Sequence, residues 1–460
     1  MSHDLIRSVS PQRPKEALGT WPDIGSDGVA EAVRSASRAR EAWAGRTAAQ
    51  RGQVIRAAAD KMEADADGLA ALMVCEVGKP ITEAISEVAR AVAILRYYAQ
   101  ATLDPDGATY PSADGRSLLM ARRRPRGVVV LITPWNFPVA IPVWKLAPAL
   151  AWGNTVLLKP ASQAMACALR VAGYFDAPEG VLQVLVTGAE GARRLAALPD
   201  VDAISFTGSA GVGHELAVIA AARGVPLQAE MGGSNASLVL PDADVAFAAQ
   251  TIARAAMGYA GQKCTATSRV IVVGDRNDFR QAFVEAVRSL PVGDPAASKT
   301  VVGPVISEAA REHVLDGARE AERSGGSVML GGAAIPGDGY FVAPTIVELP
   351  DTRAELAHEE FFGPICAFMR AVDIDEALRL ANSTRYGLVA AVFTNDLTRA
   401  LSIADDLDAG LVRINAATTG VDFHAPFGGN KASSQGPREQ GRAAREFYTS
   451  TTTITISPQG

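Results

Sequence analysis

Apolar residues recur at helical spacing over the first hundred residues and at strand spacing after that. Between residues 28 and 102 they fall at positions i, i+3, i+4 and i+7, which predicts a run of amphipathic helices. Beyond this run, short apolar segments such as "GVVVLIT", "NTVLLKP" and "VDAISFTG" alternate with short helical patterns. Buried strands separated by helices indicate a parallel sheet with crossover helices.

A second alternation follows Cys264, from "RVIVVG" to "LVRIN". The pattern therefore predicts two α/β domains in series. The Thr-rich tail "FYTSTTTITIS" alternates and predicts one more strand. A lone strand would expose an open edge, so we expect it to pair with "SLLMARRR" or with another subunit.

Composition narrows the possible classes. The chain has 460 residues, 48% of them hydrophobic and 20% charged, which favours two or three domains with large cores. The net charge of −6 and the lack of a long basic run argue against a nucleic-acid partner. Four scattered cysteines, no apolar signal segment and no long apolar span predict a soluble protein of the reducing cytoplasm, without a membrane partner. No histidine stands at metal-ligand spacing from a cysteine, and "HEEFF" lacks the second histidine of a zinc-protease helix, so we expect no metal.

Four loops at predicted strand ends suggest a nucleotide site: "TPWNFP", "KPASQ", "TGAEG" and "FTGSAGVG". Gly208 and Ser209 would open a helix whose N-terminus faces a pyrophosphate, although such a turn alone is more often just a turn. Lys159 could reach a ribose or phosphate, or could simply extend to solvent. No acid follows it, and Ser162 would tolerate a 2′-phosphate, so NADP should be accepted as well as NAD.

Three polar residues near strand ends suggest chemistry: Asn136, Glu230 and Cys264. Each residue alone also has a structural interpretation: Asn136 as a helix cap, Glu230 as one half of a surface ion pair, and Cys264 as a small packing residue. Cys264 is unusual because it lies in the small, polar stretch "GYAGQKCTATSR". The other cysteines lie in apolar segments, where packing is the simpler role.

Taken together, the motifs "PWNFP", "KPASQ", "FTGS", "EMGGSN", "GQKC", "EEFFGP" and "PFGG" resemble the aldehyde dehydrogenase superfamily, whose members oxidise aldehydes to acids with NAD(P). The resemblance runs from about residue 25 to 456 and implies two doubly wound α/β domains plus a small β oligomerisation element. It implies a homodimer or homotetramer. The segment before residue 25 is short, so the leading hairpin of many members is expected to be missing. The implied parts are a cofactor-binding domain of residues 1–104 and 126–231, a catalytic domain of residues 232–431, and a bridging element of residues 105–125 and 432–460.

The resemblance also implies residue roles. Cys264 would be the nucleophile, with Lys263 favouring its thiolate. The Asn136 amide and the Cys264 backbone N–H would hold the oxyanion, and Glu230 would activate the hydrolytic water. Lys145 and Glu439 would support the proton network. The implied cofactor contacts are Thr133, Trp135, Lys159, Ser162, Gly188, Gly208, Ser209, Gly232, Glu360 and Phe362.

For the substrate, "KPASQ" resembles semialdehyde dehydrogenases that use NADP. The arginines with which succinate-semialdehyde enzymes hold a carboxylate are replaced here by Trp144 and Gly258. "GQKCTATSR" and "GVDFHAPFGGNKASSQGPREQG" are closer to α-ketoglutaric-semialdehyde (2,5-dioxopentanoate) dehydrogenases. The implied pocket is mostly apolar, which leaves a less polar aldehyde open, and consists of Phe137, Ile141, Trp144, Thr265, Phe423, His424 and Phe427.

Three alternatives compete with this interpretation. A CoA-acylating dehydrogenase would commonly lack Glu230. A cysteine hydrolase would need a histidine beside Cys264, and the sequence does not place His214 or His424 there. A non-catalytic scaffold would have no need to keep Cys264, Glu230 and Asn136 together.

Overall fold

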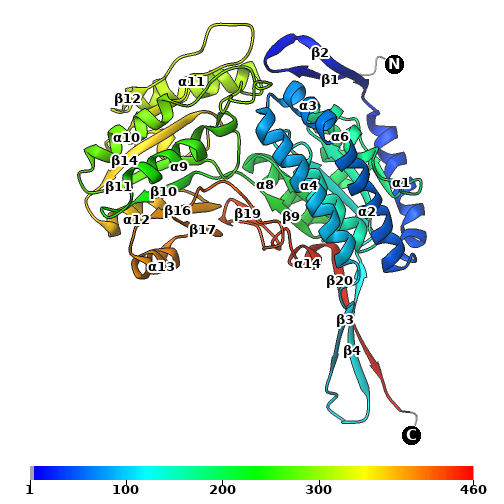
Figure 1. Cartoon of the computed structure of the whole chain (residues 1–460). Coiled ribbons are helices and arrows are strands. Elements are labelled where there is room, and N and C mark those ends of the chain that lie inside the picture. The colour runs from blue at the N-terminus through cyan, green and yellow to red at the C-terminus, as the bar shows by residue number, and fades with distance from the viewer. Residues whose placement is uncertain (1–4, 459–460) are drawn as a thin grey trace.

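Two α/β lobes lie side by side, and a narrow β arm projects from one of them (Figure 1). The computed structural model describes residues 5–458. The first lobe is built on a six-stranded sheet in the order β19-β9-β8-β5-β6-β7, in which β5 to β9 run parallel and β19 is antiparallel. Its strands are β5 Val128–Thr133, β6 Thr155–Pro160, β7 Leu182–Val184, β8 Ala203–Thr207, β9 Leu227–Glu230 and β19 Ser434–Gln435.

Helices cover both faces of this sheet. Successive residues of β5 enter different cores: Val129 and Leu131 pack in one, and Val128 and Val130 in the other. This two-sided burial explains why the strand is uniformly apolar, and the predicted parallel sheet with crossover helices is confirmed. The helices are α1 Gly25–Ala44, α2 Ala48–Ala64, α3 Ala66–Val77, α4 Ile81–Ala101, α5 Ala140–Ala151, α6 Met165–Ala172, α7 Ala189–Ala197 and α8 Ala210–Arg223.

The second lobe contains a seven-stranded sheet in the order β12-β13-β14-β11-β10-β16-β17, parallel except for β12. The sequence pattern missed its first strand and helix, because β10 is only five residues long and follows β9 after a four-residue turn. The strands are β10 Asn235–Val239, β11 Thr267–Val273, β12 Ser327–Leu330, β13 Thr345–Glu348, β14 Ile365–Ala371, β16 Val389–Phe393 and β17 Leu411–Ile414. The helices are α9 Val245–Met257, α10 Asn277–Arg288, α11 Glu308–Arg323, α12 Ile374–Asn382 and α13 Leu397–Asp406.

The arm is a three-stranded antiparallel sheet in the order β20-β4-β3. Its strands are β3 Gly107–Tyr110, β4 Leu118–Pro125 and β20 Thr449–Ile456. The predicted pairing of the Thr-rich tail with "SLLMARRR" is confirmed, since β20 pairs with β4 along its whole length. Of the residues 432–460, only β20 belongs to the arm, because β19 extends the first sheet.

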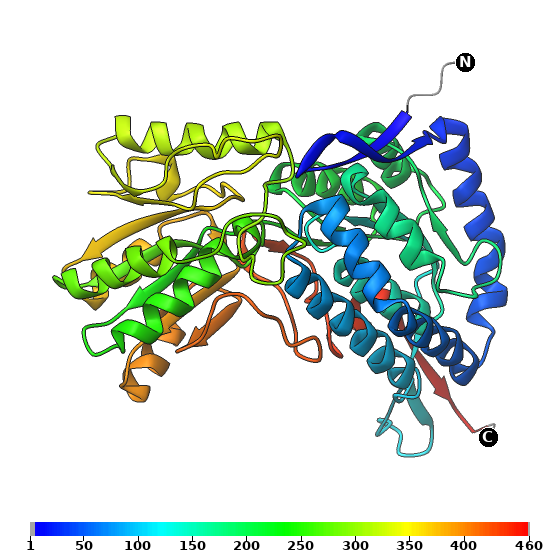
Figure 2. The same ribbon diagram turned by 45° about the horizontal axis from the view of Figure 1, so that its top comes forward.

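An N-terminal hairpin precedes α1, so the expectation that it is missing was wrong. Its strands are β1 Leu5–Ser10 and β2 Arg13–Pro22. The hairpin lies over the first lobe, and its turn reaches the junction of the two lobes (Figure 2). The Gln12 side chain donates a hydrogen bond to the Val74 carbonyl at 2.9 Å, and the Tyr340 N–H donates to the Pro11 carbonyl at 3.0 Å. The short segment therefore suffices for a hairpin because both lobes provide contacts for its turn.

Within residues 5–458, no helix combines the length and apolar character needed to cross a membrane. In the same part of the chain, no three histidine, cysteine, aspartate or glutamate side chains gather as metal ligands would.

Candidate active site

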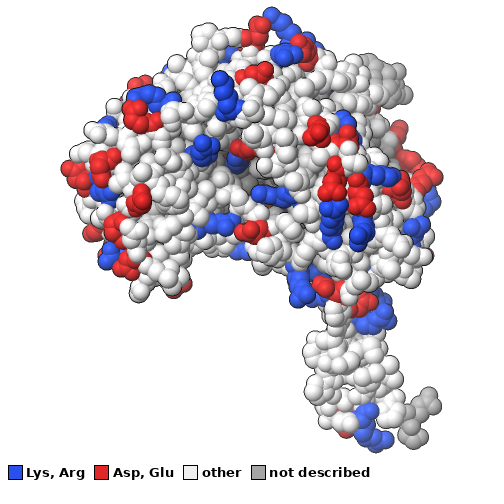
Figure 3. Space-filling model, in the orientation of Figure 1, with Lys and Arg blue, Asp and Glu red and all other residues white. Residues whose placement is uncertain are grey.

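Cys264 lies where two cavities meet between the lobes. The first cavity has a volume of about 790 Å³ including its mouth, and the second has a volume of about 820 Å³. Their walls share two residues, Cys264 and Ile141. Figure 3 shows a hollow between the lobes, with both basic and acidic side chains near it. Cys264 therefore lies between two cavities, which suits a reaction between two ligands that enter separately.

Polar side chains hold the loop of Cys264 in place. Asn235, at the start of β10, donates from its amide to the carbonyls of Cys264 and Ala266, both at 2.8 Å. On the other side, the Gln262 amide donates to the Pro304 carbonyl at 3.1 Å and accepts from the Ile306 N–H at 2.8 Å. Asn235 and Gln262 stand in the motifs "EMGGSN" and "GQKC", but the motifs alone do not reveal that these side chains support the loop.

Asn136 lies beside this loop, in the turn after β5. Its side-chain nitrogen donates to the Gln262 carbonyl at 3.0 Å, and the residue is only 3% exposed. An amide nitrogen carries two hydrogens, so one donor remains after this bond. Asn136 lines the first cavity together with Cys264.

The Cys264 thiol is not activated in this state. Burial raises its pKa to about 12, and the negative charges of Glu360 and Glu230 contribute in the same direction. Lys263, which we expected to favour the thiolate, pairs instead with Glu83 at 2.8 Å. The positive charge of Lys263 is thus paired with a carboxylate on the wall of the second cavity, and its expected effect on the thiolate stays a prediction.

The Glu230 carboxylate ends β9 and is buried. It accepts a hydrogen bond from the Gln228 amide at 3.2 Å and another from the Ser434 hydroxyl. Burial raises its pKa well above the usual range, and the nearby Glu439 carboxylate adds to this effect. Glu230 is absent from the walls of both cavities, so in this state its carboxylate is held away from the space next to Cys264.

A chain of polar side chains continues from Glu230 into the first lobe. Glu439 pairs with the buried ammonium of Lys145, which donates to the Ser205 hydroxyl at 2.7 Å. Ser205 donates to the Gln228 oxygen at 2.7 Å, and Gln228 reaches Glu230. The second oxygen of Glu439 has no partner among the described residues. Ser205 and Gln228 were not anticipated from the sequence, where each is one polar letter in an apolar strand.

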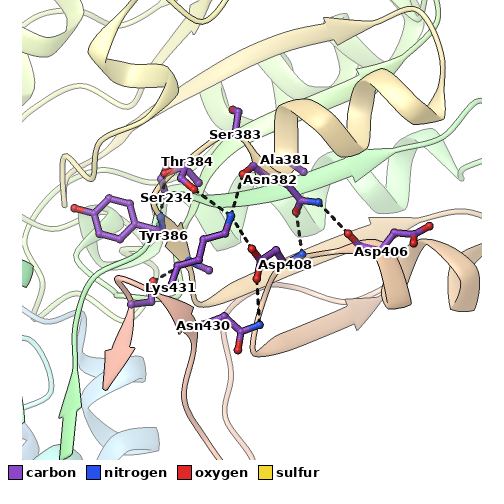
Figure 4. Close-up of polar contacts among 12 residues, drawn as sticks. Ser234, Ala381, Asn382, Ser383, Thr384, Tyr386, Asp406, Asp408, Asn430 and Lys431 are labelled. Carbon is purple, nitrogen blue, oxygen red and sulfur yellow. Dashed lines mark hydrogen bonds and ion pairs between the residues drawn. The ribbon is translucent and has the colours of Figure 1, made fainter. Parts of the chain in front are cut away.

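The closing segment, residues 427–435, runs between the lobes and carries the partner of Glu230. Lys431, in the middle of this segment, attaches it to the second lobe (Figure 4). Its ammonium donates to the carbonyls of Asn382 at 2.9 Å and Thr384 at 3.1 Å, and pairs with Asp408 at 3.0 Å. A lysine at a helix C-terminus suits these carbonyls, because their partial charges are negative.

The C-terminal part of the closing segment is hydrogen-bonded to the first lobe. The Met231 N–H donates to the Ser433 carbonyl at 2.8 Å, and the Ser433 hydroxyl donates to the Gly232 carbonyl at 2.8 Å. Ser434 pairs with Glu230 in the sheet register. The position of Glu230 therefore depends on both lobes.

The first cavity runs from Cys264 to the N-terminus of α8, where Gly208 and Ser209 line it. On the opposite wall Glu360 accepts from the Gly233 N–H at 3.2 Å, and burial raises its pKa to about 7. A Cβ atom at Gly232 would collide with this carboxylate, so any larger residue there would have to displace the Glu360 side chain. Trp135 and Phe362 both line the cavity. Their rings pack edge to face, with the ring centres 5.6 Å apart.

The remaining expected cofactor residues lie farther along the same sheet edge. Thr133 and Lys159 are at the ends of β5 and β6, Ser162 follows β6, and Gly188 precedes α7. Burial lowers the pKa of Lys159. Asp23, not predicted from the sequence, accepts from the Gly188 N–H at 3.0 Å. Burial would raise its pKa, but hydrogen bonds from Gly25 and Gly188 outweigh this and lower it, so the carboxylate stays ionised.

The second cavity is apolar near Cys264 and polar along α4. Phe423 and His424 are not in its wall; the Phe423 ring instead packs against Tyr97 at 5.8 Å. The expected residues in the wall are Phe137, Ile141, Trp144, Thr265 and Phe427, and those not anticipated are Glu83, Ser86, Glu87, Arg90, Lys263, Thr419, Gly420 and Val421.

A buried ion pair connects α4 to both loops of the site. Glu87 pairs with Lys79 and accepts from the N–H groups of Val139 and Ala140, at 3.0 and 2.9 Å, where α5 begins. The Lys79 ammonium lies 3.7 Å from the ring centre of Phe137, next to Asn136. This pair was missed because no local pattern distinguishes it from a surface pair.

Comparisons with known proteins agree with this geometry. A profile described as the aldehyde dehydrogenase family matches residues 1–454. The alpha-ketoglutaric semialdehyde dehydrogenase of Bacillus subtilis (strain 168) is 40% identical over 467 residues, which cover 99% of this chain and 96% of that protein.

Two solved structures have a TM-score of 0.95 with this chain. The NAD-dependent aldehyde dehydrogenase from Sinorhizobium meliloti is 34% identical, with 99% of this chain and 93% of that one covered. An E. coli NADP-dependent enzyme is 32% identical, with 99% and 95% covered. These values extend the similarity over both lobes and the arm.

Proposed function

Because this chain belongs to the aldehyde dehydrogenase family and is an NAD(P)-dependent oxidoreductase, we propose that its substrate is a semialdehyde such as 2,5-dioxopentanoate. The observation that carries the assignment of the site is the position of Cys264 between two cavities. The name of the 40% identical relative supports the substrate class. The product is the corresponding carboxylic acid.

The first cavity fits a dinucleotide. The N-terminus of α8 presents free N–H groups that suit a phosphate, and Gly232 leaves room beside Glu360. The hydroxyls of Thr133 and Thr207, at the ends of β5 and β8, are buried without a partner among the described residues. Such groups are satisfied when a polar ligand binds. When bound, the cofactor accepts a hydride from the substrate.

The chain's own residues carry the other steps. The Cys264 sulfur, once deprotonated, attacks the aldehyde carbon and forms a thiohemiacetal. The free hydrogen of the Asn136 amide and the Cys264 backbone N–H stabilise the oxygen that becomes negative. One such donor contributes about 3 kcal/mol in related acyl-transfer reactions. Loss of the hydride leaves a thioester on Cys264.

Glu230 then removes a proton from the water that hydrolyses the thioester. For this step its carboxylate leaves Ser434 and Gln228 and turns toward Cys264. Lys145, Glu439 and Ser205 orient the Gln228 amide that donates to Glu230, and the proton that Glu230 takes up leaves to solvent. A CoA-acylating reaction would have no use for a buried base at this position.

The proposed substrate class is tested with purified protein and a panel of aldehydes. The rate of cofactor reduction is compared for 2,5-dioxopentanoate, succinate semialdehyde and pentanal, each with and without CoA. We expect the highest kcat/KM for 2,5-dioxopentanoate and no dependence on CoA. A preference for pentanal would refute the semialdehyde proposal, and a dependence on CoA would favour the acylating alternative.

Cofactor choice is proposed to depend on position 162. Ser162→Glu should shift the ratio of kcat/KM values toward NAD⁺ by at least about tenfold, because a carboxylate repels a 2′-phosphate and accepts from ribose hydroxyls. A hydrogen bond to a charged group contributes ~1.5–3 kcal/mol. Steady-state kinetics with both cofactors measure the ratio. Ser289→Glu, on an exposed turn of the second lobe, is the matched control. An unchanged ratio in Ser162→Glu would contradict this account.

We also propose that the arm joins subunits into a homodimer or homotetramer. Leu118, Tyr110 and Ile456 are exposed on it, and a three-stranded sheet has a free edge that another chain can cover. Deleting residues 449–460 removes β20 but keeps the buried Phe447 and Tyr448, and should lower the oligomer mass. Light scattering measures it, with deletion of residues 457–460 as the control. The same mass in both truncated proteins would mean that β20 is not needed for assembly.

A further inference from the structure

We propose that Arg90 binds the carboxylate of the substrate. This inference rests on the proposed semialdehyde substrate and gives that substrate a specific anchor. The two arginine positions expected from the sequence hold Trp144 and Gly258, so the chain needs its anchor elsewhere if its substrate is an anion. The second cavity supplies one, because its wall includes Arg90 as well as Cys264.

The charges of this wall single out Arg90. Glu83 is neutralised by Lys263 at 2.8 Å, and Glu87 by the buried Lys79. Within residues 5–458 no ion pair includes Arg90, although two carboxylates lie on the same wall. When the buried Lys79 behind the wall is counted with the wall residues, the two ion pairs cancel and Arg90 leaves one positive charge in excess, which attracts an anionic substrate.

The placement of Arg90 follows from the geometry of α4. Glu83, Glu87 and Arg90 stand at positions i, i+4 and i+7, so they share one face of the helix. Glu87 fixes this face against α5 through the N–H groups of Val139 and Ala140. The half-buried Arg90 thus projects from a rigid support, and its planar guanidinium can bind a carboxylate with two parallel hydrogen bonds.

The rest of the wall suits the carbon chain of the substrate. Phe137, Ile141 and Phe427 provide apolar contact close to Cys264. The Trp144 ring lies 6.0 Å from that of Phe427, and its indole N–H is buried without an acceptor among the described residues. A substrate with an aldehyde at one end and a carboxylate at the other would place the aldehyde at the sulfur and the carboxylate toward α4.

The test compares an acidic and a neutral aldehyde of equal length. Arg90→Met keeps much of the apolar stem and removes the charge, and Arg90→Lys keeps the charge but not the planar pair of donors. We measure kcat/KM for 2,5-dioxopentanoate and for pentanal. In Arg90→Met the ratio of the two values should fall at least about tenfold, as expected for losing a hydrogen-bonded charge. In Arg90→Lys this ratio should fall less than in Arg90→Met, because the positive charge is kept.

Arg96→Met is the matched control, since Arg96 lies on the same helix but pairs with Asp60 and Glu63 at the surface. A binding readout supports the kinetics: the inhibition constant of glutarate should rise in Arg90→Met and not in Arg96→Met. If the wild-type enzyme prefers 2,5-dioxopentanoate and Arg90→Met retains the full ratio, the Arg90 inference is overturned. If the wild-type enzyme shows no such preference, the substrate proposal itself fails.

Discussion

Cys264→Ala is expected to abolish aldehyde oxidation, with a loss in kcat of about four orders of magnitude or more. The variant keeps the loop, which is held by the Asn235 amide and the Gln262 side chain rather than by the sulfur. It loses the sulfur that we propose forms the thioester, and removal of a nucleophile in comparable covalent mechanisms is that costly. Steady-state cofactor reduction measures the loss, and calorimetry should show that NAD(P)⁺ still binds.

The control for this variant is Cys75→Ala, which removes an exposed cysteine from α3. It should retain wild-type turnover. If Cys264→Ala turned over at a rate near that of the wild type, the assignment of Cys264 as nucleophile would be wrong.

Glu230→Gln is expected to separate the two halves of the reaction. The amide has the shape of the carboxylate but cannot take a proton from water, so the thioester should form and then persist. Rapid mixing should show one equivalent of reduced cofactor per active site, followed by steady-state turnover lowered about 100-fold or more. Mass spectrometry of the stalled protein should find the acyl group on Cys264.

The pH dependence offers a second readout. Burial and Glu439 raise the pKa of Glu230, so the deprotonated, basic fraction of its carboxyl increases as pH rises through this raised pKa. Deacylation by the wild-type enzyme should therefore accelerate with increasing pH, and this acceleration should be lost in Glu230→Gln. Glu63→Gln, which alters an exposed carboxylate on α2, is the control. A burst absent from Glu230→Gln with an unchanged steady-state rate would contradict the assignment.

The sequence predicts most of the fold because its buried strands are uniformly apolar. Strands such as β5 are buried on both faces, and this is visible in the letters themselves. The hairpin of residues 5–22 is not predicted, because its contacts at Gln12 and Pro11 come from residues far along the chain. The strand β10 is missed because it is short and directly follows a turn.

Some residues of the site are likewise predictable from the sequence, and others are not. Cys264, Glu230 and Asn136 stand in recognisable motifs, and their motifs alone suggested the chemistry. The pair of Lys79 and Glu87 has no such signal, since its role comes from packing against α5 and the Phe137 ring. The activating role expected for Lys263 stays a prediction, because a charge that is adjacent in the chain is not necessarily unpaired in space, and here Lys263 pairs with Glu83.

The closing segment has a consequence for the order in which the enzyme matures. Ser434 and Glu230 are 204 residues apart, and the whole second lobe is synthesised between them. A chain emerging from the ribosome can assemble β5 to β9 early, but the edge strand β19 joins that sheet only after the second lobe has been made. The hydroxyl that holds the Glu230 carboxylate thus arrives only after the whole second lobe. A half-synthesised chain lacks this contact, so Glu230 takes its final position only when translation is nearly finished.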